Sequence, residues 1–127
     1  MGYLWVALGG ALGSVARYAC AALGVRVFGA AFPWSTLFVN VTGSIVIGVL
    51  AALATADAKP LVTGDARAFL MIGVLGGFTT FSSFSLETLN LARAGQLAAA
   101  GWNVAGSVVL CLVGVGLGYL AGGAFNR

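Results

Sequence analysis

Apolar residues run through the chain in four long stretches that short polar connections separate. Each stretch has about 20 residues or more, which is the length that a helix needs to cross the hydrocarbon core of a bilayer. We predict an all-α integral membrane protein with a single four-span domain over residues 1–127. Its transmembrane helices are expected at about residues 3–24, 34–56, 67–91 and 97–123. The first stretch lacks a basic start and a cleavage site, so it is predicted to be a span and not a signal peptide.

The third stretch departs from the apolar pattern near its middle, where residues 76–85 read GGFTTFSSFS. Two consecutive glycines weaken a helix by about 1 kcal/mol each relative to alanine, and the threonines after them compete for backbone hydrogen bonds. Non-helical backbone at membrane depth is tolerated only where it is buried in protein or lines a cavity. We therefore predict that the third helix breaks at Gly76-Gly77, in mid-membrane, and that half-helix ends at this break bind a cation.

Polar and small residues recur at four-residue spacing on the second and fourth stretches. Asn40 and Ser44 share one helix face, and so do Asn103 and Ser107. A buried amide such as Asn40 is costly unless it is satisfied. It contacts either a ligand or a neighbouring helix, and the sequence leaves both interpretations open. We expect the side chains of Asn103 and Ser107 to face the same region of the protein as the third stretch.

Phe81 and Phe84 lie three residues apart, so a helix would place them on one face. Ser82 and Ser83 add hydroxyl groups between the rings. Hydroxyl and amide groups donate hydrogen bonds and suit an anion. A ring presents a positive edge to an anion or a negative face to a cation, and the sequence does not decide between them. Core or lipid-facing phenylalanines are the alternative, which the surrounding serines and threonines make less attractive.

The composition excludes most other classes of protein. Hydrophobic residues make up 61% of the chain and charged residues 7%, with a mean hydropathy of +1.06. The sequence has no histidine, no metal-ligand cluster and no nucleophile with a base partner. It also lacks a phosphate-binding loop and a basic aromatic patch. We therefore expect neither an enzyme nor a nucleic-acid-binding protein, and the lipid bilayer is its expected solvent.

The positive charges give almost no information about membrane orientation. With four spans, the side that holds both termini carries Lys59, Arg67 and Arg127, and the other side carries Arg26 and Arg93. The positive-inside rule needs an imbalance, and here the two sides are nearly equal. The chain either has one weakly specified orientation or inserts in both orientations and pairs antiparallel. We favour the second interpretation.

Arg17 is a charged residue still within the first apolar stretch. A charge near membrane depth costs about 2.5–3.5 kcal/mol on insertion scales. Arg17 is therefore expected either to extend towards the interface or to face an aqueous vestibule, where its positive potential would attract anions. Elsewhere in the same stretch, Gly9 and Gly13 lie four apart. Small residues at this spacing let another helix approach closely.

The run GGFTTFSSFS, followed after one residue by Glu87, resembles the hallmark segment of the Fluc (CrcB-type) fluoride ion channels. The similarity extends over the whole chain. It includes the glycine-rich first span with Arg17, the Pro33-Trp34 start of the second span with Asn40 beyond it, and the Asn103/Ser107 face of the fourth span. Chain length and the four-span layout agree as well.

This resemblance implies an antiparallel, dual-topology homodimer with two fluoride pathways. It implies a structural Na⁺ at the dimer centre, held by the backbone carbonyls of Gly76 and Thr79 from both subunits. It places Arg17 at a vestibule, and it implies a pathway formed by Asn40, Phe81, Phe84, Ser82, Ser83, Ser107 and Asn103. Two positions depart from some family members, because a tyrosine can replace Asn103 and a hydroxyl residue can replace Cys111.

The function implied by the resemblance is passive export of cytoplasmic fluoride through the bacterial inner membrane, which protects the cell from fluoride toxicity. The alternative is a proton-coupled exporter of the small multidrug-resistance type, which shares the size, the four spans and dual topology. That mechanism needs a membrane-embedded carboxylate. The first stretch has none, and Glu87 is interpreted as an interfacial carboxylate late in the third. A non-transporting scaffold is a third possibility, but a scaffold gains nothing from a broken helix.

Overall fold

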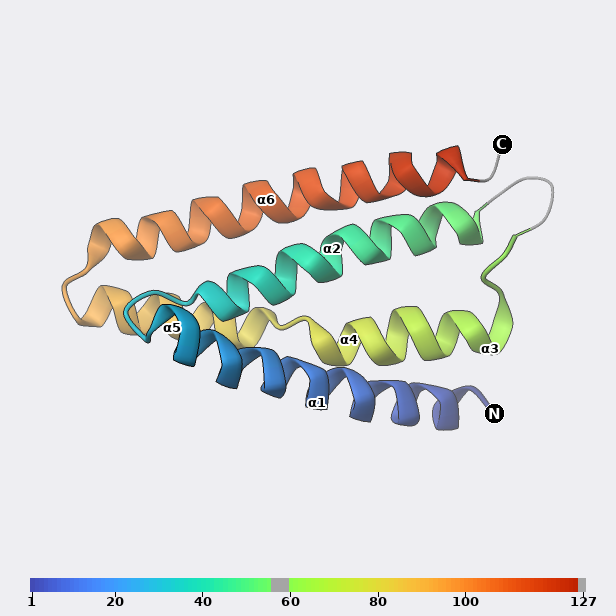
Figure 1. Ribbon diagram of the computed structural model, residues 1–127, viewed down its shortest axis with the longest axis horizontal. Coiled ribbons are helices and arrows are strands. Elements are labelled where there is room, and N and C mark those ends of the chain that lie inside the picture. The colour runs from blue at the N-terminus through green and yellow to red at the C-terminus, as the bar shows by residue number, and fades with distance from the viewer. Residues whose placement is uncertain (56–59, 126–127) are drawn as a thin grey trace.

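The computed structural model describes residues 1–55 and 60–125. Lys59, Arg127 and the expected end of the second span at residue 56 lie outside this part of the chain. Within the described residues, four helical segments are long and apolar enough to cross a membrane. They lie alongside one another in a bundle (Figure 1). The prediction of four apolar spans, with the third interrupted, is confirmed.

Three of the four segments are continuous helices: α1 (Gly2–Phe28), α2 (Trp34–Ala54) and α6 (Leu97–Ala124). The third segment has several parts, which are α3 (Gly64–Arg67), the π-helix η1 (Ala68–Val74), α4 (Leu75–Phe78) and α5 (Phe81–Arg93). The helix α5 ends where Gly95 adopts a φ of 77°, a conformation that glycine accepts without strain. This turn leads directly into α6.

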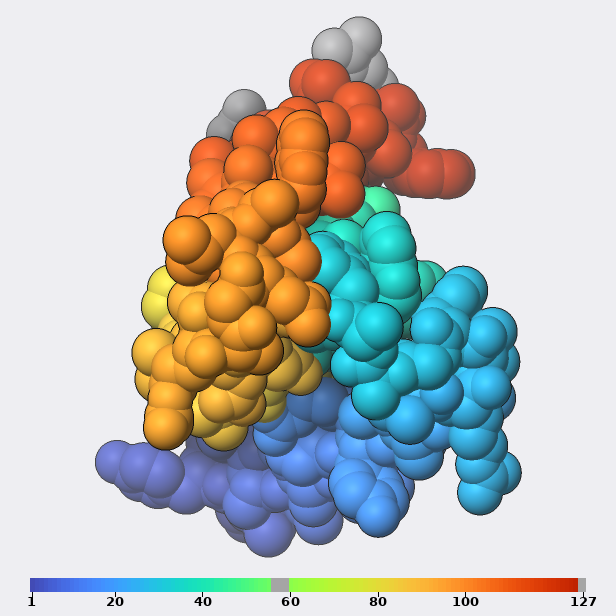
Figure 2. Space-filling model, turned by 90° about the vertical axis from the view of Figure 1, so that its left-hand side faces the viewer, coloured from blue at the N-terminus to red at the C-terminus, as the bar shows by residue number. Residues whose placement is uncertain are grey.

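Both termini lie at the end of the bundle where α2 connects to α3, and the other two connections lie at the opposite end (Figure 1). The view along the bundle shows α6 and α1 on opposite sides, with α2 and α5 between them (Figure 2). The helix α2 packs along α6, whereas α1 packs against η1 and α4. The third segment therefore joins the two halves of the bundle.

The helix break does not fall where the sequence placed it. We predicted a break at Gly76-Gly77, but α4 continues through both glycines to Phe78. The backbone is extended at Thr79 (φ −76°, ψ 156°) and at Thr80 (φ −154°, ψ 113°). Gly77 is helical and lies against α1, where an added Cβ would be 2.5 Å from the Gly10 carbonyl oxygen. This glycine therefore permits close helix packing, and the two threonines form the break.

The close approach that Gly9 and Gly13 predicted is present. A Cβ added at Gly9 would meet the Phe69 carbonyl oxygen and the Gly73 backbone, and one at Gly13 would meet the Val74 carbonyl oxygen. The partner of α1 over this length is η1, a π-helix that the sequence did not predict. π-Helical turns are rare and occur often at functional sites. Here only the four residues of α4 separate the π-helix from the helix break.

We predict that Gly13→Ala destabilises the protein, because the added methyl group would force α1 away from the backbone of the third segment. Overpacking of this kind typically costs about 1–3 kcal/mol. Thermal unfolding in detergent measures the effect. The matched control is Gly116→Ala in α6, where an added Cβ meets nothing within 4 Å. Equal unfolding temperatures for the two variants would contradict this account of the α1 contact.

Candidate ion-binding cavity at the helix break

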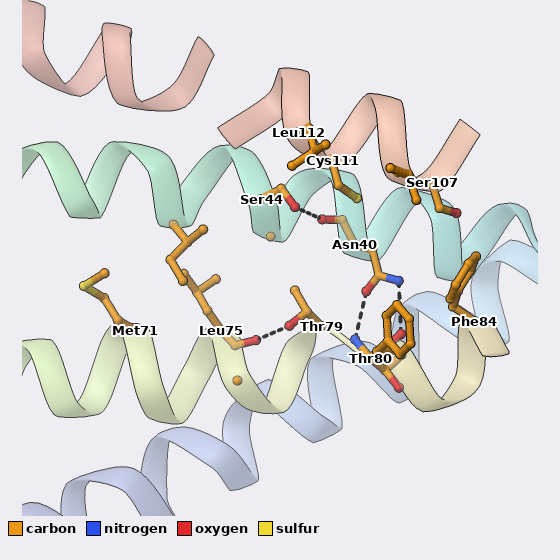
Figure 3. A pocket seen from close by; sticks show the side chains of 15 residues that line it. Asn40, Ser44, Met71, Leu75, Thr79, Thr80, Phe84, Ser107, Cys111 and Leu112 are labelled. Atoms are coloured by element: carbon orange, nitrogen blue, oxygen red, sulfur yellow. Dashed lines mark hydrogen bonds between the residues drawn. The ribbon is translucent and has the colours of Figure 1, made fainter. Parts of the chain in front are cut away.

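A cavity of about 450 Å³ lies beside the helix break, between α2, the third segment and α6. Figure 3 shows its walls, with the break at Thr79 and Thr80 facing the polar positions of α2. Apolar side chains from all three segments line most of its surface. The polar or thiol-bearing side chains that line it are Asn40, Ser44, Thr79, Thr80, Ser107 and Cys111. The cavity thus combines a mostly apolar wall with polar groups gathered near the break.

The side chain of Asn40 binds both backbone groups of Thr80. Its Nδ2 donates to the Thr80 carbonyl oxygen at 3.1 Å, and the Thr80 N–H donates to its Oδ1 at 2.8 Å. Figure 3 shows the amide reaching from α2 to the break. Asn40 therefore bonds between helices, one of the two roles that the sequence left open. Because Nδ2 carries two hydrogens, a second N–H remains for a ligand in the cavity that Asn40 lines.

Several backbone carbonyls lose their helical donors at the break, among them those of Gly76 and Thr79. In an uninterrupted helix, the Gly76 carbonyl would accept from the N–H of residue 80, and the Thr79 carbonyl from that of residue 83. The Thr80 N–H is bound to Asn40 instead, and the Ser83 N–H donates to the Thr80 Oγ1 at 3.2 Å. Unwound carbonyls of this kind coordinate Na⁺ in other membrane proteins. The Gly76 and Thr79 carbonyls, which the family resemblance implies as Na⁺ ligands, are thus among those that have lost their helical donors.

The hydroxyl of Thr80 is the centre of a small cluster at the start of α5. It caps the helix through the Ser83 N–H and lies 3.1 Å from the Ser83 Oγ and 3.2 Å from the Ser82 Oγ. Thr80 itself is 7% exposed. Ser82 and Ser83 were predicted from the sequence as site residues, whereas Thr80 was not. A threonine three residues before a serine, at the start of a helix, is the N-cap spacing that could have revealed it.

Phe81 and Phe84 both line the cavity, as their shared helix face predicted. Their ring centroids lie 5.2 Å apart, with the ring planes at 53°. Phe84 is 8% exposed, whereas Phe81 is 77% exposed on the open side of the cavity. The Phe84 ring is therefore buried within the subunit, whereas the Phe81 ring lies on its surface at the open side of the cavity.

The fourth span contributes Ser107 and, one turn later, Cys111 to the cavity. Ser107 is 7% exposed, and its Oγ is buried with no hydrogen-bond partner in the described part of the chain. Asn103, expected on the same face, does not line the cavity; its Nδ2 donates to the Thr88 Oγ1 at 2.8 Å. Arg17 is half-buried on α1 and lines neither this cavity nor the second one described below.

A second cavity, of about 410 Å³, is lined by Glu87 and by Thr36 at the start of α2. The Thr36 hydroxyl donates to the Glu87 Oε1 at 2.8 Å. The other carboxylate oxygen is buried without a partner among residues 1–55 and 60–125. Glu87 was predicted to be an interfacial carboxylate, and it lies in a cavity that residues of the α1–α2 and α5–α6 connections also line. This pairing was not evident from the sequence because the two residues lie 51 positions apart.

Comparison of the amino-acid sequence with known proteins assigns the chain to one family. Residues 4–119 match the family model described as CrcB-like protein, Camphor Resistance (CrcB). The chain belongs to this family. A match of this extent covers all four helical segments of the CrcB-like protein, including the break and both cavities.

Curated relatives of this CrcB-like protein carry the name fluoride-specific ion channel FluC. The relative from Opitutus terrae is 56% identical over 124 residues, which cover 98% of this chain and 94% of that protein. The relative from Rhodospirillum rubrum is 52% identical, with coverage of 100% and 98%. The relative from Thermus thermophilus is 53% identical, with coverage of 96% and 95%. With its four apolar helical segments, this CrcB-like protein is a multi-pass bacterial membrane protein.

We predict that Asn40→Leu destabilises the extended backbone at Thr79–Thr80. The substitution leaves the Thr80 N–H and carbonyl without their partner in an apolar bundle. An unsatisfied buried backbone group costs about 1–3 kcal/mol. Faster amide hydrogen exchange at Thr80 and a lower unfolding temperature are the expected readouts. Ser44→Ala is the control, because among residues 1–55 and 60–125 the Ser44 hydroxyl bonds only to the Asn40 backbone carbonyl within α2. Unchanged exchange at Thr80 in Asn40→Leu would show that the amide does not hold the break.

Proposed function

We propose that this CrcB-like protein is a fluoride-selective ion channel that lets cytoplasmic fluoride leave the cell passively. The observation that carries the proposal is the break itself, beside a cavity lined by amide and hydroxyl groups and by two phenylalanine rings. The curated relatives named as fluoride-specific ion channels support the same assignment over nearly the whole chain.

The fluoride pathway runs past the start of α5. Phe81 and Phe84 present ring edges, which carry partial positive charge, to an anion that has shed water. Asn40, Ser82 and Ser83 replace the lost water with hydrogen bonds, and the unpartnered hydroxyl of Ser107 supplies a further donor. The N-terminus of α5 is the positive end of its helix dipole, so it also favours an anion at this point of the pathway. These groups together offset the cost of dehydrating a small halide.

Arg17 supplies positive potential at a vestibule and draws anions towards the pathway. The driving force for export is the membrane potential. The weak acid HF enters from an acidic exterior and ionises in the more neutral cytoplasm, which traps fluoride there. A negative-inside potential then expels the anion with about 2.3 kcal/mol per charge per 100 mV. The channel accordingly resides in the bacterial inner membrane and needs no coupled reaction.

A second copy of the chain completes the pathway. Phe81 is 77% exposed, and Gly76 and Ser82 beside the break are also exposed in the single chain. Irregular backbone does not face lipid within the hydrocarbon core, so protein must cover this side. The nearly equal numbers of positive charges on the two membrane sides support insertion in both orientations. We infer an antiparallel homodimer that buries the two breaks against each other.

The carbonyls of Gly76 and Thr79 fit a Na⁺ ion at the centre of this dimer. Their helical donors are diverted to Asn40 and Thr80, and an added Cβ at Gly76 would meet nothing within 4 Å in the single chain. Gly76 is therefore not required by packing inside the subunit. The ion would be held by these carbonyls of both copies and would supply a fixed positive charge beside the two breaks.

The small multidrug-resistance type of exporter is not favoured. Proton exchange would need a carboxylate beside the transported molecule. The carboxylate of the third span, Glu87, belongs to the second cavity and accepts a hydrogen bond from Thr36. The full-length similarity to fluoride-specific ion channels points away from this alternative as well.

Purified protein in liposomes loaded with fluoride should release the ion rapidly when a potassium ionophore compensates the charge. Phe81→Ile should stop this release, because an aliphatic side chain has no positive edge to meet the anion. A fluoride electrode measures the efflux. The dimer should remain assembled in the variant, and unchanged efflux would contradict the role of this ring.

We further predict that the dimer depends on Na⁺. Exchange of Na⁺ for the bulky cation N-methyl-D-glucamine should shift the detergent-solubilised protein towards monomer, as light scattering would detect, because the carbonyls then repel one another. Phe81→Ile should show the same Na⁺ dependence as the wild type. Labelling of single cysteines from both sides of the membrane tests the antiparallel arrangement. A stable dimer without Na⁺, or labelling from one side only, would count against this assembly.

A further inference from the structure

We propose that Asn103 and Thr88 form a positioning pair that fixes Phe84 and thereby sets the halide selectivity of the pathway. This inference rests on the proposed role of Phe84 in conduction. Thr88 was not singled out by its sequence context, and Asn103 was expected to contact the permeating ion itself. Their contacts point to a different role for both residues.

The pair forms a directed chain of hydrogen bonds from α6 to the backbone of α5. The Asn103 Nδ2 donates to the Thr88 Oγ1 at 2.8 Å, and the Thr88 Oγ1 donates to the Phe84 carbonyl oxygen at 2.7 Å. The threonine hydroxyl has one hydrogen. Because that hydrogen is used on Phe84, the hydroxyl can meet Asn103 only as an acceptor. Each bond therefore determines the direction of the other.

Asn103 is 1% exposed, which makes it one of the most deeply buried side chains among the described residues. It lies one helical turn before Ser107, and only Ser107 lines the cavity. A fully buried amide must find partners inside the protein. Asn103 uses its amide to tie α6 to α5, and it leaves the cavity wall to the next turn of α6.

The anchored carbonyl belongs to the residue whose ring is most tightly held in the cavity. Phe84 is 8% exposed and contacts Phe81. A threonine hydroxyl that bonds the carbonyl four residues earlier bends a helix locally. The link to α6 fixes that bend, so the Phe84 ring edge keeps one position relative to Ser107. A small, dehydrated fluoride and a larger chloride differ in how well they tolerate displacement of this edge.

The same helix contains a natural comparison. Ser85 makes the same type of bond, from its Oγ to the Phe81 carbonyl oxygen at 2.9 Å. Ser85 is exposed, and in the described structure its hydroxyl has no bond from another helix. The two positions therefore differ. The bond at Thr88 affects halide selectivity because α6 anchors it, whereas the bond at Ser85 lacks this anchor and does not affect selectivity.

The test measures fluoride and chloride efflux from liposomes containing wild type, Thr88→Val, Thr88→Ser, Asn103→Leu or Ser85→Ala. Valine keeps the shape of threonine and removes both hydrogen bonds. The chloride-to-fluoride permeability ratio should rise by roughly 10- to 100-fold in Thr88→Val, by analogy with metal sites, where loss of a hydrogen-bond partner behind a ligand has effects on this scale. Thr88→Ser should restore the wild-type ratio, and Ser85→Ala should leave it unchanged.

Asn103→Leu should give the same change as Thr88→Val, and the double variant should give no more than either alone, because both remove one connected unit. If Asn103→Leu does not assemble, Thr88→Val and its serine rescue decide the question. An unchanged ratio in Thr88→Val, or an equal change in Ser85→Ala, would overturn the proposal.

A second readout separates this proposal from the proposed function. In protein labelled with 4-fluorophenylalanine, the ¹⁹F signal of Phe84 is assigned by its loss in Phe84→Leu. This signal should shift in Thr88→Val and Asn103→Leu and stay in place in Ser85→Ala. If the wild type conducts no fluoride, the proposed function fails, and the ¹⁹F shifts still decide whether the pair positions the ring. A Phe84 signal that is the same in all variants would reject the positioning role.

Discussion

Two hydrogen bonds between the Asn40 amide and the Thr80 backbone keep the third segment non-helical at the break. The other features of the site follow from this contact. A break in a membrane helix leaves backbone groups without water to satisfy them. A single asparagine supplies one donor and one acceptor at the spacing of a peptide group, so it satisfies both groups of Thr80. With the Thr80 N–H bound in this way, the Gly76 carbonyl has lost its helical donor.

The C-terminus of α4 and the N-terminus of α5 meet at the break and carry partial charges of opposite sign. The last carbonyls of α4 carry partial negative charge, and the first N–H groups of α5 carry partial positive charge. Thr80 separates them and gathers the hydroxyls of Ser82 and Ser83 on the positive side. This separation of partial charges arises from the backbone, because no charged side chain lines the cavity among the residues that the structure describes.

Glycine contacts keep this arrangement in place. Gly13 and Gly77 bring α1 against the third segment, and Gly118 and Gly122 bring α6 against α2. In a bilayer, burial of apolar surface does not drive helices together, so close van der Waals packing must do so. The bundle therefore has two tightly packed seams, and the cavity lies between the α2–α6 pair and the segment that α1 supports.

The sequence by itself determined the number of spans and the presence of a polar interruption in the third, because bilayer thickness and the cost of buried polar groups act on each segment separately. It also indicated that Phe81 and Phe84 share one face of a helix, since helical spacing fixes which residues lie on the same side. Only the tertiary structure placed the break at Thr79–Thr80, because Gly77 packs in helical conformation against α1 and Asn40 binds the backbone of Thr80. It also directed Asn103 towards Thr88, since a buried polar group takes the partner that packing brings near it, and the sequence does not show which partner that is.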